Sequence, residues 1–191
     1  MAVFARLQLE EAAFSLFERD SDLAHQVIDR NTELANAELE LEQQGVDTLE
    51  TFQLSGEELR FVLSAMRISR NIKRIGDHAV KIAERSLQLM GLPDRRGANF
   101  IQPVYDRTIS MLIEGMSAFA DQDLVLARGL PVRAAELENL FTAALLKYSD
   151  LIETGNARRD DVMALISVLR SLERVGHLAT SIGEDVTIGR A

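Results

Sequence analysis

Glu173 and His177 are the residues whose types and spacing come closest to a reactive site in this sequence. A carboxylate and an imidazole four residues apart lie on one face of a helix, where they can share a zinc or iron ion. Glu184 lies two turns further along, and Glu138 is placed to supply a carboxylate from a neighbouring helix. The alternative is that His177 packs at a helix interface and donates a hydrogen bond to Glu173. Iron or zinc is therefore a hypothesis at this site, and nothing in the sequence requires a cofactor.

Asp77 and Glu84 repeat part of this pattern about 100 residues earlier. Here Lys73 and Lys81 each lie one helical turn from Asp77, and ion pairs at that spacing stabilise a helix face by about 0.2–0.5 kcal/mol without a metal. The pattern thus favours an ion-paired face over a metal site. His78, next to Asp77, is typical of a side chain at a helix interface.

A stripe of arginines recurs at intervals of three and four residues on the third predicted helix, as Arg67, Arg70 and Arg74, and Arg170 and Arg174 occupy the matching positions of the sixth. Guanidinium groups on one helix face can bind an anion or an acidic partner. They can equally pair within the chain with a preceding acidic helix, whose carboxylates are Glu33, Glu38, Glu40 and Glu42. Because the chain carries a net charge of −9, we favour the intramolecular pairing.

Several classes of function are disfavoured by what the sequence lacks. It contains no Gly-rich phosphate loop, no Gly-x-Ser-x-Gly turn and no His-Glu-x-x-His pair. Cysteine is absent, which excludes thiolate sites and disulfides, and the net negative charge repels a nucleic-acid backbone. No apolar run approaches the roughly 18 residues that span a bilayer. We expect a cytoplasmic protein that is not an enzyme, does not bind nucleic acid, and reaches a membrane only through a partner or a transporter region outside this sequence.

The elements that must position these residues are all helical, because apolar residues recur with helical period and strand-like alternation is missing. We predict six helices, at about residues 2–19, 20–44, 55–90, 101–120, 121–154 and 158–188. Residues 91–97 are typical of a connector. The predicted fold class is all-α, with two tandem antiparallel three-helix bundles spanning residues 1–92 and 98–191.

Capping residues and helix breakers predict several helix ends. The candidate N-caps are Asp20 or Ser21, Ser55 with Glu58 as a capping box, and Asp121 or Asp123. Residues 45–48 predict a break after the second helix, and Pro131 predicts a kink or a late start in the fifth.

The strongest organisational signal is an internal duplication. A shift of 100 positions brings the third predicted helix onto the sixth, including Arg-x-x-x-Arg-x-Gly in both copies. The matched apolar positions are Ile68, Ile72, Ile75, Ala79 and Ile82 against Val168, Leu172, Val175, Ala179 and Ile182. A shift of 103 matches the second helix to the fifth, pairing Asp20, Ala24, Glu33 and Leu34 with Asp123, Ala127, Glu136 and Leu137.

Gly76 and Gly176 occupy the same position in the two copies, in the middle of a predicted helix. Glycine there costs about 1 kcal/mol relative to alanine. Its repetition predicts that another backbone approaches closely at both places.

Residues 70–84 closely resemble the signature of PhoU-family proteins, and residues 172–184 are similar to that of the second PhoU repeat. Residues 58–68 are similar to the run that precedes the signature. The resemblance covers nearly the whole chain. It implies a cytoplasmic negative regulator of phosphate uptake and signalling, which contacts the ATP-binding subunit of a phosphate ABC transporter, a sensor histidine kinase, or both, and which forms a homodimer in many members.

The resemblance also implies a metal motif, because some PhoU proteins bind iron or other metals through Glu/Asp-x-x-x-Asp on each third helix. The motif positions here read Lys73 with Asp77, and Glu173 with His177. Asp77 and Glu173 match the motif, whereas Lys73 and His177 depart from it. Asn31 stands where family members often carry an acid.

Two alternatives to a stand-alone regulator stay open at this point. Related domains are appended to sodium–phosphate cotransporters and other membrane transporters, so the chain could be the cytoplasmic regulatory region of such a protein. A carboxylate-based metal-binding helical protein is the third hypothesis.

Overall fold

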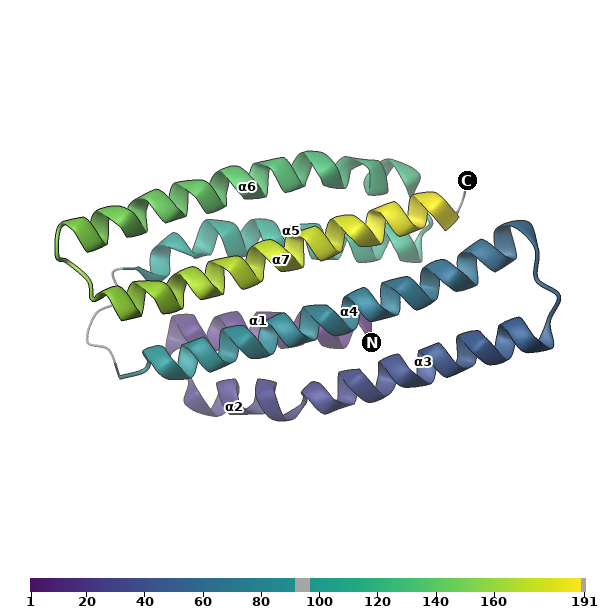
Figure 1. Cartoon of the computed structure of the whole chain (residues 1–191), viewed down its shortest axis with the longest axis horizontal. Coiled ribbons are helices and arrows are strands. Elements are labelled where there is room, and N and C mark those ends of the chain that lie inside the picture. The colour runs from purple at the N-terminus through teal and green to yellow at the C-terminus, as the bar shows by residue number, and fades with distance from the viewer. Residues whose placement is uncertain (92–96, 190–191) are drawn as a thin grey trace.

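The computed structural model describes residues 1–91 and 97–189, and within these ranges the chain contains helices and turns but no strand (Figure 1). The predicted all-α fold is confirmed. The elements are α1 (Ala2–Glu18), α2 (Ser21–Asp29), α3 (Asn31–Thr51), α4 (Gly56–Leu89), the 3₁₀ turn η1 (Ala98–Phe100), α5 (Gln102–Ala120), α6 (Leu124–Glu153) and α7 (Arg159–Gly189). The predicted connector lies mostly at residues 92–96, outside the described part of the chain.

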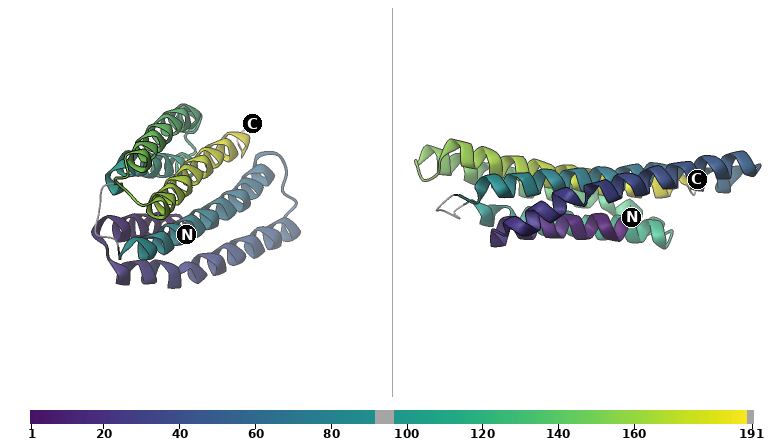
Figure 2. Two further views of the ribbon diagram at one scale, coloured as in Figure 1. Left: turned by 60° about the vertical axis from the view of Figure 1, so that its left-hand side comes forward. Right: turned by 90° about the horizontal axis from the view of Figure 1, so that it is seen from below.

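The long helices α6, α7, α4 and α3 lie side by side in one layer, and the shorter α1 and α5 form a second layer behind α4 and α7 (Figures 1 and 2). α1 to α4 form the first bundle and α5 to α7 the second. α4 and α7 run antiparallel at the centre and form the main contact between the bundles (Figure 1). The outer face of this central pair is open to solvent.

The two bundles are built on the predicted apolar positions of α4 and α7. All ten of those residues are buried, with exposed fractions of 6 % or less. Burying each of the larger aliphatic side chains contributes roughly 1.5–3 kcal/mol. The alternating spacing of three and four residues therefore forms the core of each bundle, as the duplication predicts.

The second predicted helix differs from the structure in two ways. It is divided at Arg30 into α2 and α3, and it continues to Thr51 instead of breaking at residues 45–48. Gly45 is buried inside α3, where a Cβ atom would lie 2.6 Å from the Met66 sulfur. The glycine therefore makes room for α4, and the prediction that it ends a helix was wrong.

Two of the predicted caps form and one does not. The Asp20 carboxylate accepts a hydrogen bond from the Leu23 amide at 2.9 Å, and the Asp123 carboxylate accepts from the amides of Val125 and Leu126. Ser55 precedes α4, but its hydroxyl makes no capping hydrogen bond, so the predicted capping box is absent. α6 begins at Leu124, which contradicts a late helix start at Pro131.

Close backbone approach occurs at glycines other than the predicted pair. At Gly76 a Cβ atom would meet only side-chain atoms, of Gln8, Asn31 and Leu34, and at Gly176 it would meet the Leu137 side chain. By contrast, a Cβ atom on Gly115 would lie 3.0 Å from the Ala179 carbonyl oxygen. The prediction of backbone contact at Gly76 and Gly176 was therefore wrong.

The same glycine contacts confirm the register of the duplication. Leu34 faces Gly76 in the first bundle, and Leu137 faces Gly176 in the second. These are the partners that shifts of 103 and 100 positions match to each other. Each bundle thus places a leucine of its middle helix over the glycine of its long helix.

Candidate functional site

Glu173 and His177 lie on α7 and do not form the predicted pair. His177 is exposed and Glu173 half-buried, and no hydrogen bond joins them. The alternative interpretation, a histidine packed at an interface and donating to Glu173, was also wrong, because the exposed His177 ring is not packed at an interface.

Asp77 on α4 is held by a lysine and an amide. The Lys73 ammonium donates to both carboxylate oxygens, at 3.0 and 2.7 Å, and the Asn31 amide from α3 donates at 3.2 Å. The Asp77 carboxylate is therefore bonded within the chain. The predicted ion pair with Lys73 forms, whereas the predicted pair of Asp77 with Lys81 does not form among the described residues.

The first two arginines of the stripe are paired within the chain. Arg67 donates from Nε to the Asp185 carboxylate on α7 at 2.5 Å, and Asp185 is largely buried. Arg70 lies 3.2 Å from Glu42 and 3.9 Å from Glu38 on α3. Intramolecular pairing is thus confirmed for Arg70, whereas Arg67 uses a carboxylate of the other bundle.

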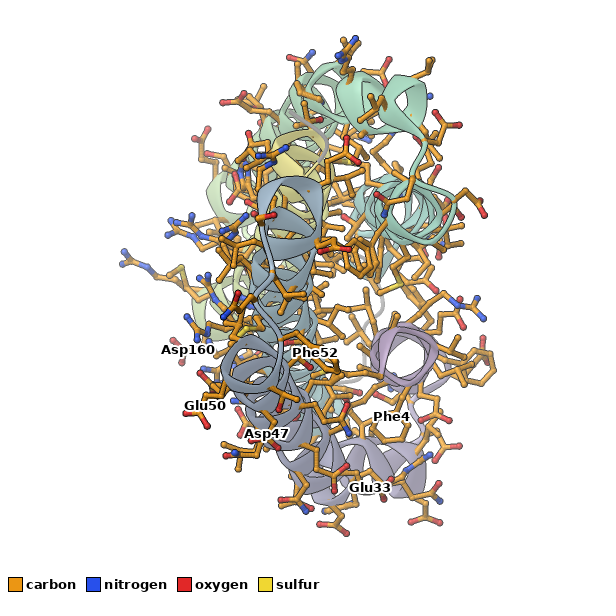
Figure 3. All side chains as sticks on the ribbon, turned by 90° about the vertical axis from the view of Figure 1, so that its right-hand side faces the viewer. Phe4, Glu33, Asp47, Glu50, Phe52 and Asp160 are labelled. Carbon is orange, nitrogen blue, oxygen red and sulfur yellow. The ribbon has the colours of Figure 1, made fainter. Side chains whose placement is uncertain are left out.

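The remaining cations gather on the open face of α4 and α7. Arg74, Lys81, Arg170 and Arg174 are exposed, and none has a carboxylate partner within the described residues. In Figure 3 the labelled acidic residues Glu33, Asp47 and Glu50 lie on α3. We call the outer surface of α4 and α7, which carries the four exposed cations, the cationic face.

His78 lies on α4 among these cations, and its side chain is half-buried. Its pKa is lowered to about 4, chiefly by burial, and further by Lys81, Arg74 and Arg174, while Asp77 acts in the opposite direction. Its Nδ1 atom is buried without a hydrogen-bond partner. The imidazole is therefore neutral at pH 7 in a locally positive environment.

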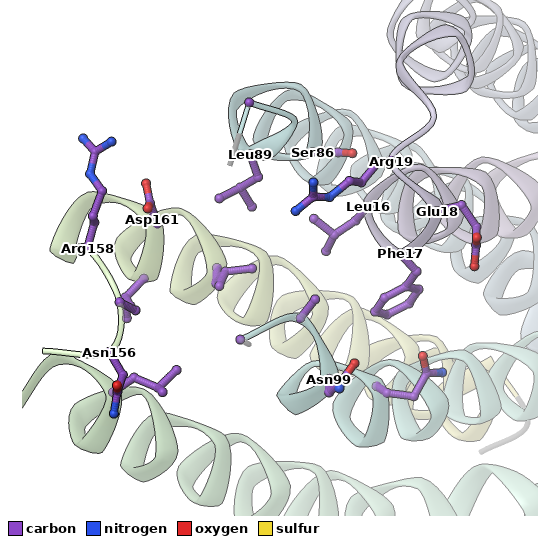
Figure 4. Close-up of a pocket in the computed structure, with 18 of the residues that line it drawn as sticks. Leu16, Phe17, Glu18, Arg19, Ser86, Leu89, Asn99, Asn156, Arg158 and Asp161 are labelled. Atoms are coloured by element: carbon purple, nitrogen blue, oxygen red, sulfur yellow. The ribbon is translucent and has the colours of Figure 1, made fainter. Parts of the chain in front are cut away.

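A cavity of about 660 Å³ opens at the end of the molecule, between the two bundles (Figure 4). Leu16 and Phe17 from α1, Leu89 from α4 and Leu165 from α7 line it, and the Ser86 hydroxyl in its wall is buried without a partner. Two arginines and two acids balance the charge at its rim, namely Arg19, Arg158, Glu18 and Asp161. The sequence carried no signal for this cavity, because helix ends far apart in the chain form its wall.

A family model of the PhoU domain matches this chain twice, over residues 1–86 and 101–186. The chain belongs to the PhoU domain family. A relative from Pseudomonas putida, described as a phosphate-specific transport system accessory protein PhoU homolog, is 29% identical over 93% of this chain and 70% of its own length. A relative from Methanothermobacter thermautotrophicus, described as a phosphate-specific transport system accessory protein PhoU homolog 1, is 28% identical over 88% of this chain and 78% of its own length.

Solved structures agree with this assignment. The crystal structure of PhoU from Pseudomonas aeruginosa superposes with a TM-score of 0.94 at 28% identity, covering all of this chain and 91% of the other. The PhoU regulatory protein from Streptococcus pneumoniae superposes with a TM-score of 0.89 at 19% identity, which shows the shared fold.

The metal motif of the PhoU family does not fit the residues of this chain. Lys73 binds both oxygens of Asp77. Of the other proposed ligands, Glu173 is half-buried, and Glu84, Glu138, His177 and Glu184 are exposed. Across residues 1–91 and 97–189, no three acids or histidines gather closely enough to hold a metal ion. We therefore assign no step of the function to a metal.

Two further features of the structure concern its helices. Among the residues that the structure describes, no helix is both long and apolar enough to cross a lipid bilayer. Tyr148, which the sequence left without a role, is fully buried and donates a hydrogen bond to the Gly97 carbonyl at 2.6 Å. It fixes the start of the second bundle against α6.

Proposed function

We propose that this chain is a non-enzymatic cytoplasmic regulator of phosphate uptake and phosphate signalling. The observation that carries the proposal is the tandem PhoU match, which leaves only short segments of the chain unmatched. It is supported by relatives that match most of this chain in sequence and are named as accessory proteins of phosphate-specific transport. In this proposal the chain acts by contacting the ATP-binding subunit of a phosphate ABC transporter, a sensor histidine kinase, or both.

The chemistry of the surface fits such a role. The predicted site residues are either paired within the chain, as Asp77 is with Lys73, or lie separately on exposed helix faces, as His177 does. A nucleophile held by a base, which acyl or phosphoryl transfer requires, is not assembled around His25, His78 or His177. Rigid, exposed helix faces are instead suited to binding another protein.

The proposal is tested by co-purification with the transporter's ATP-binding subunit, in cells grown with abundant phosphate and in cells starved of it. We expect the ATP-binding subunit to be captured in at least one condition. We also expect phosphate-responsive genes to lose their repression when the gene that encodes this chain is deleted. A chain that captures neither the subunit nor the kinase in either condition, and whose deletion leaves those genes unchanged, contradicts the proposal.

A further inference from the structure

The central helices bring cations from both copies of the duplication to one place. Two contacts fix how α4 and α7 pass each other: Arg67 meets Asp185 near one end, and Arg85 donates to the Ser167 hydroxyl at 3.3 Å near the other. In this antiparallel register, position 78 lies opposite position 174. Arg174 of the second copy therefore lies across from the turn of α4 that carries His78.

Four residues form what we call the cation cluster: Arg74, His78 and Lys81 on α4, and Arg174 on α7. The three positively charged members all act on His78. Asp77 is the one carboxylate among the described groups that acts on it, and that carboxylate is already bonded to Lys73 and Asn31. Within the described residues, none of the three cations of the cluster makes an ion pair with a carboxylate.

This arrangement is unfavourable for an isolated chain. Like charges four residues apart on a helix destabilise it, and such pairs occur three times here, as Arg70 with Arg74, Lys81 with Arg85, and Arg170 with Arg174. Arg70 is relieved by Glu42, but Arg74, Arg170 and Arg174 have no partner within the described residues. In a chain of net charge −9, with acidic residues abundant elsewhere, an uncompensated cluster indicates a bound anion.

We propose that the cation cluster binds a phosphoryl oxyanion. Each guanidinium group presents several N–H donors in a rigid plane, and the lysine ammonium adds donors on a flexible side chain. This set of donors suits a tetrahedral anion with two or more charges better than it suits a single carboxylate. The inference rests on the proposed function in one respect only: the bound anion is the ligand to which such a regulator responds.

The length of the cationic face distinguishes two ligands that carry the same phosphoryl group, free phosphate and a polyphosphate chain. Free phosphate needs only the cluster itself. A polyphosphate chain also reaches Arg170, which lies one turn before Arg174, and Arg85, one turn beyond Lys81. Orthophosphate and tripolyphosphate are therefore the two probes.

Isothermal titration of the full chain with each probe, at constant ionic strength in sodium chloride, tests the proposal. We expect saturable binding that R74Q and R174Q each weaken about fivefold to tenfold, as the loss of one charge-assisted contact predicts. R128Q, which removes an exposed arginine on α6, is the matched control and should change the affinity less than twofold. If R170Q weakens only tripolyphosphate, the longer chain is the ligand.

Folding does not obscure the result, because Arg74 and Arg174 are exposed and make no ion pair within the described residues. Thermal unfolding of both variants that is unchanged, or slightly raised by the relief of charge repulsion, provides the check. Absence of saturable binding, or equal weakening by R128Q and R74Q, overturns the proposal. Capture of the transporter subunit is measured separately with R74Q/R174Q, so loss of anion binding and failure of the regulatory function are read independently.

Discussion

At the scale of single residues, His78 makes the stability of the fold depend on pH. Its pKa is lowered from 6.5 to about 4 in the folded chain. The unfolded chain therefore binds a proton at higher pH than the folded chain does. The contribution of His78 to stability is complete above pH 6.5 and is lost as the pH falls toward 4.

We expect H78Q to lose less stability than the wild-type chain between pH 7 and pH 5. The difference should be about 1 kcal/mol, because the ring is only half-buried and solvent screens part of the interaction. Urea denaturation at several pH values measures it, and H25Q on the exposed part of α2 is the control. Parallel pH profiles for H78Q and the wild type would contradict the assignment.

Residue roles could be predicted from the sequence where the partner is near in the chain. Asp20 and Asp123 cap the helices that follow them, and Lys73 pairs with Asp77 one turn away. Arg67 could not be matched to Asp185, because 118 positions separate them and only the packing of two bundles brings them together. The cation cluster was hidden for the same reason.

At the scale of helices, the duplicated sequence predicted which faces are buried but not where a helix bends. Arg30 ends α2 and precedes α3 without a glycine or proline to mark the place. The Gln8 side chain of α1 donates to the Val27 carbonyl at 2.9 Å, in the last turn of α2, where carbonyls need partners from outside the helix. A contact from another helix thus supports an end that local sequence does not encode.

The helix glycines give a matched pair of variants. In G115A the new methyl group meets the Ala179 carbonyl oxygen, and α5 must move away from α7 to admit it. We expect a loss of about 1–3 kcal/mol in the free energy of unfolding. In G76A the methyl group meets the ends of the Gln8, Asn31 and Leu34 side chains, which can rotate.

G76A should therefore stay within about 1 kcal/mol of the wild type, because alanine also gains about that amount in helix propensity. Thermal and chemical denaturation of the two variants side by side measure the contrast. A loss in G76A as large as that in G115A would show that the polar side chains around Gly76 are as rigid as the backbone around Gly115.

At the scale of the whole molecule, the tandem organisation followed from the duplication, whereas the relation between the bundles did not. The apolar positions of α4 and α7 predict which faces are buried, and they lie in one core that both bundles share. The register between the two helices depends on contacts such as Arg67 with Asp185 and Arg85 with Ser167, which no periodicity reveals. The cationic face and the cavity at the bundle junction both depend on that register.

The pair of Arg67 and Asp185 offers a test of how firmly the bundles are joined. The Asp185 side chain is 11% exposed, so removal of Arg67 leaves a carboxylate largely buried without its counter-charge. We expect R67Q to lower the free energy of unfolding by about 1–3 kcal/mol and D185N to lower it less, because a neutral amide is cheaper to bury. In the double variant R67Q/D185N the two losses should not add, which gives a coupling energy of about 1 kcal/mol. Because the pair joins α4 to α7, hydrogen exchange in R67Q should quicken at the ends of both helices together. Additive losses, or faster exchange confined to α4, would mean that apolar packing alone holds the two bundles in register.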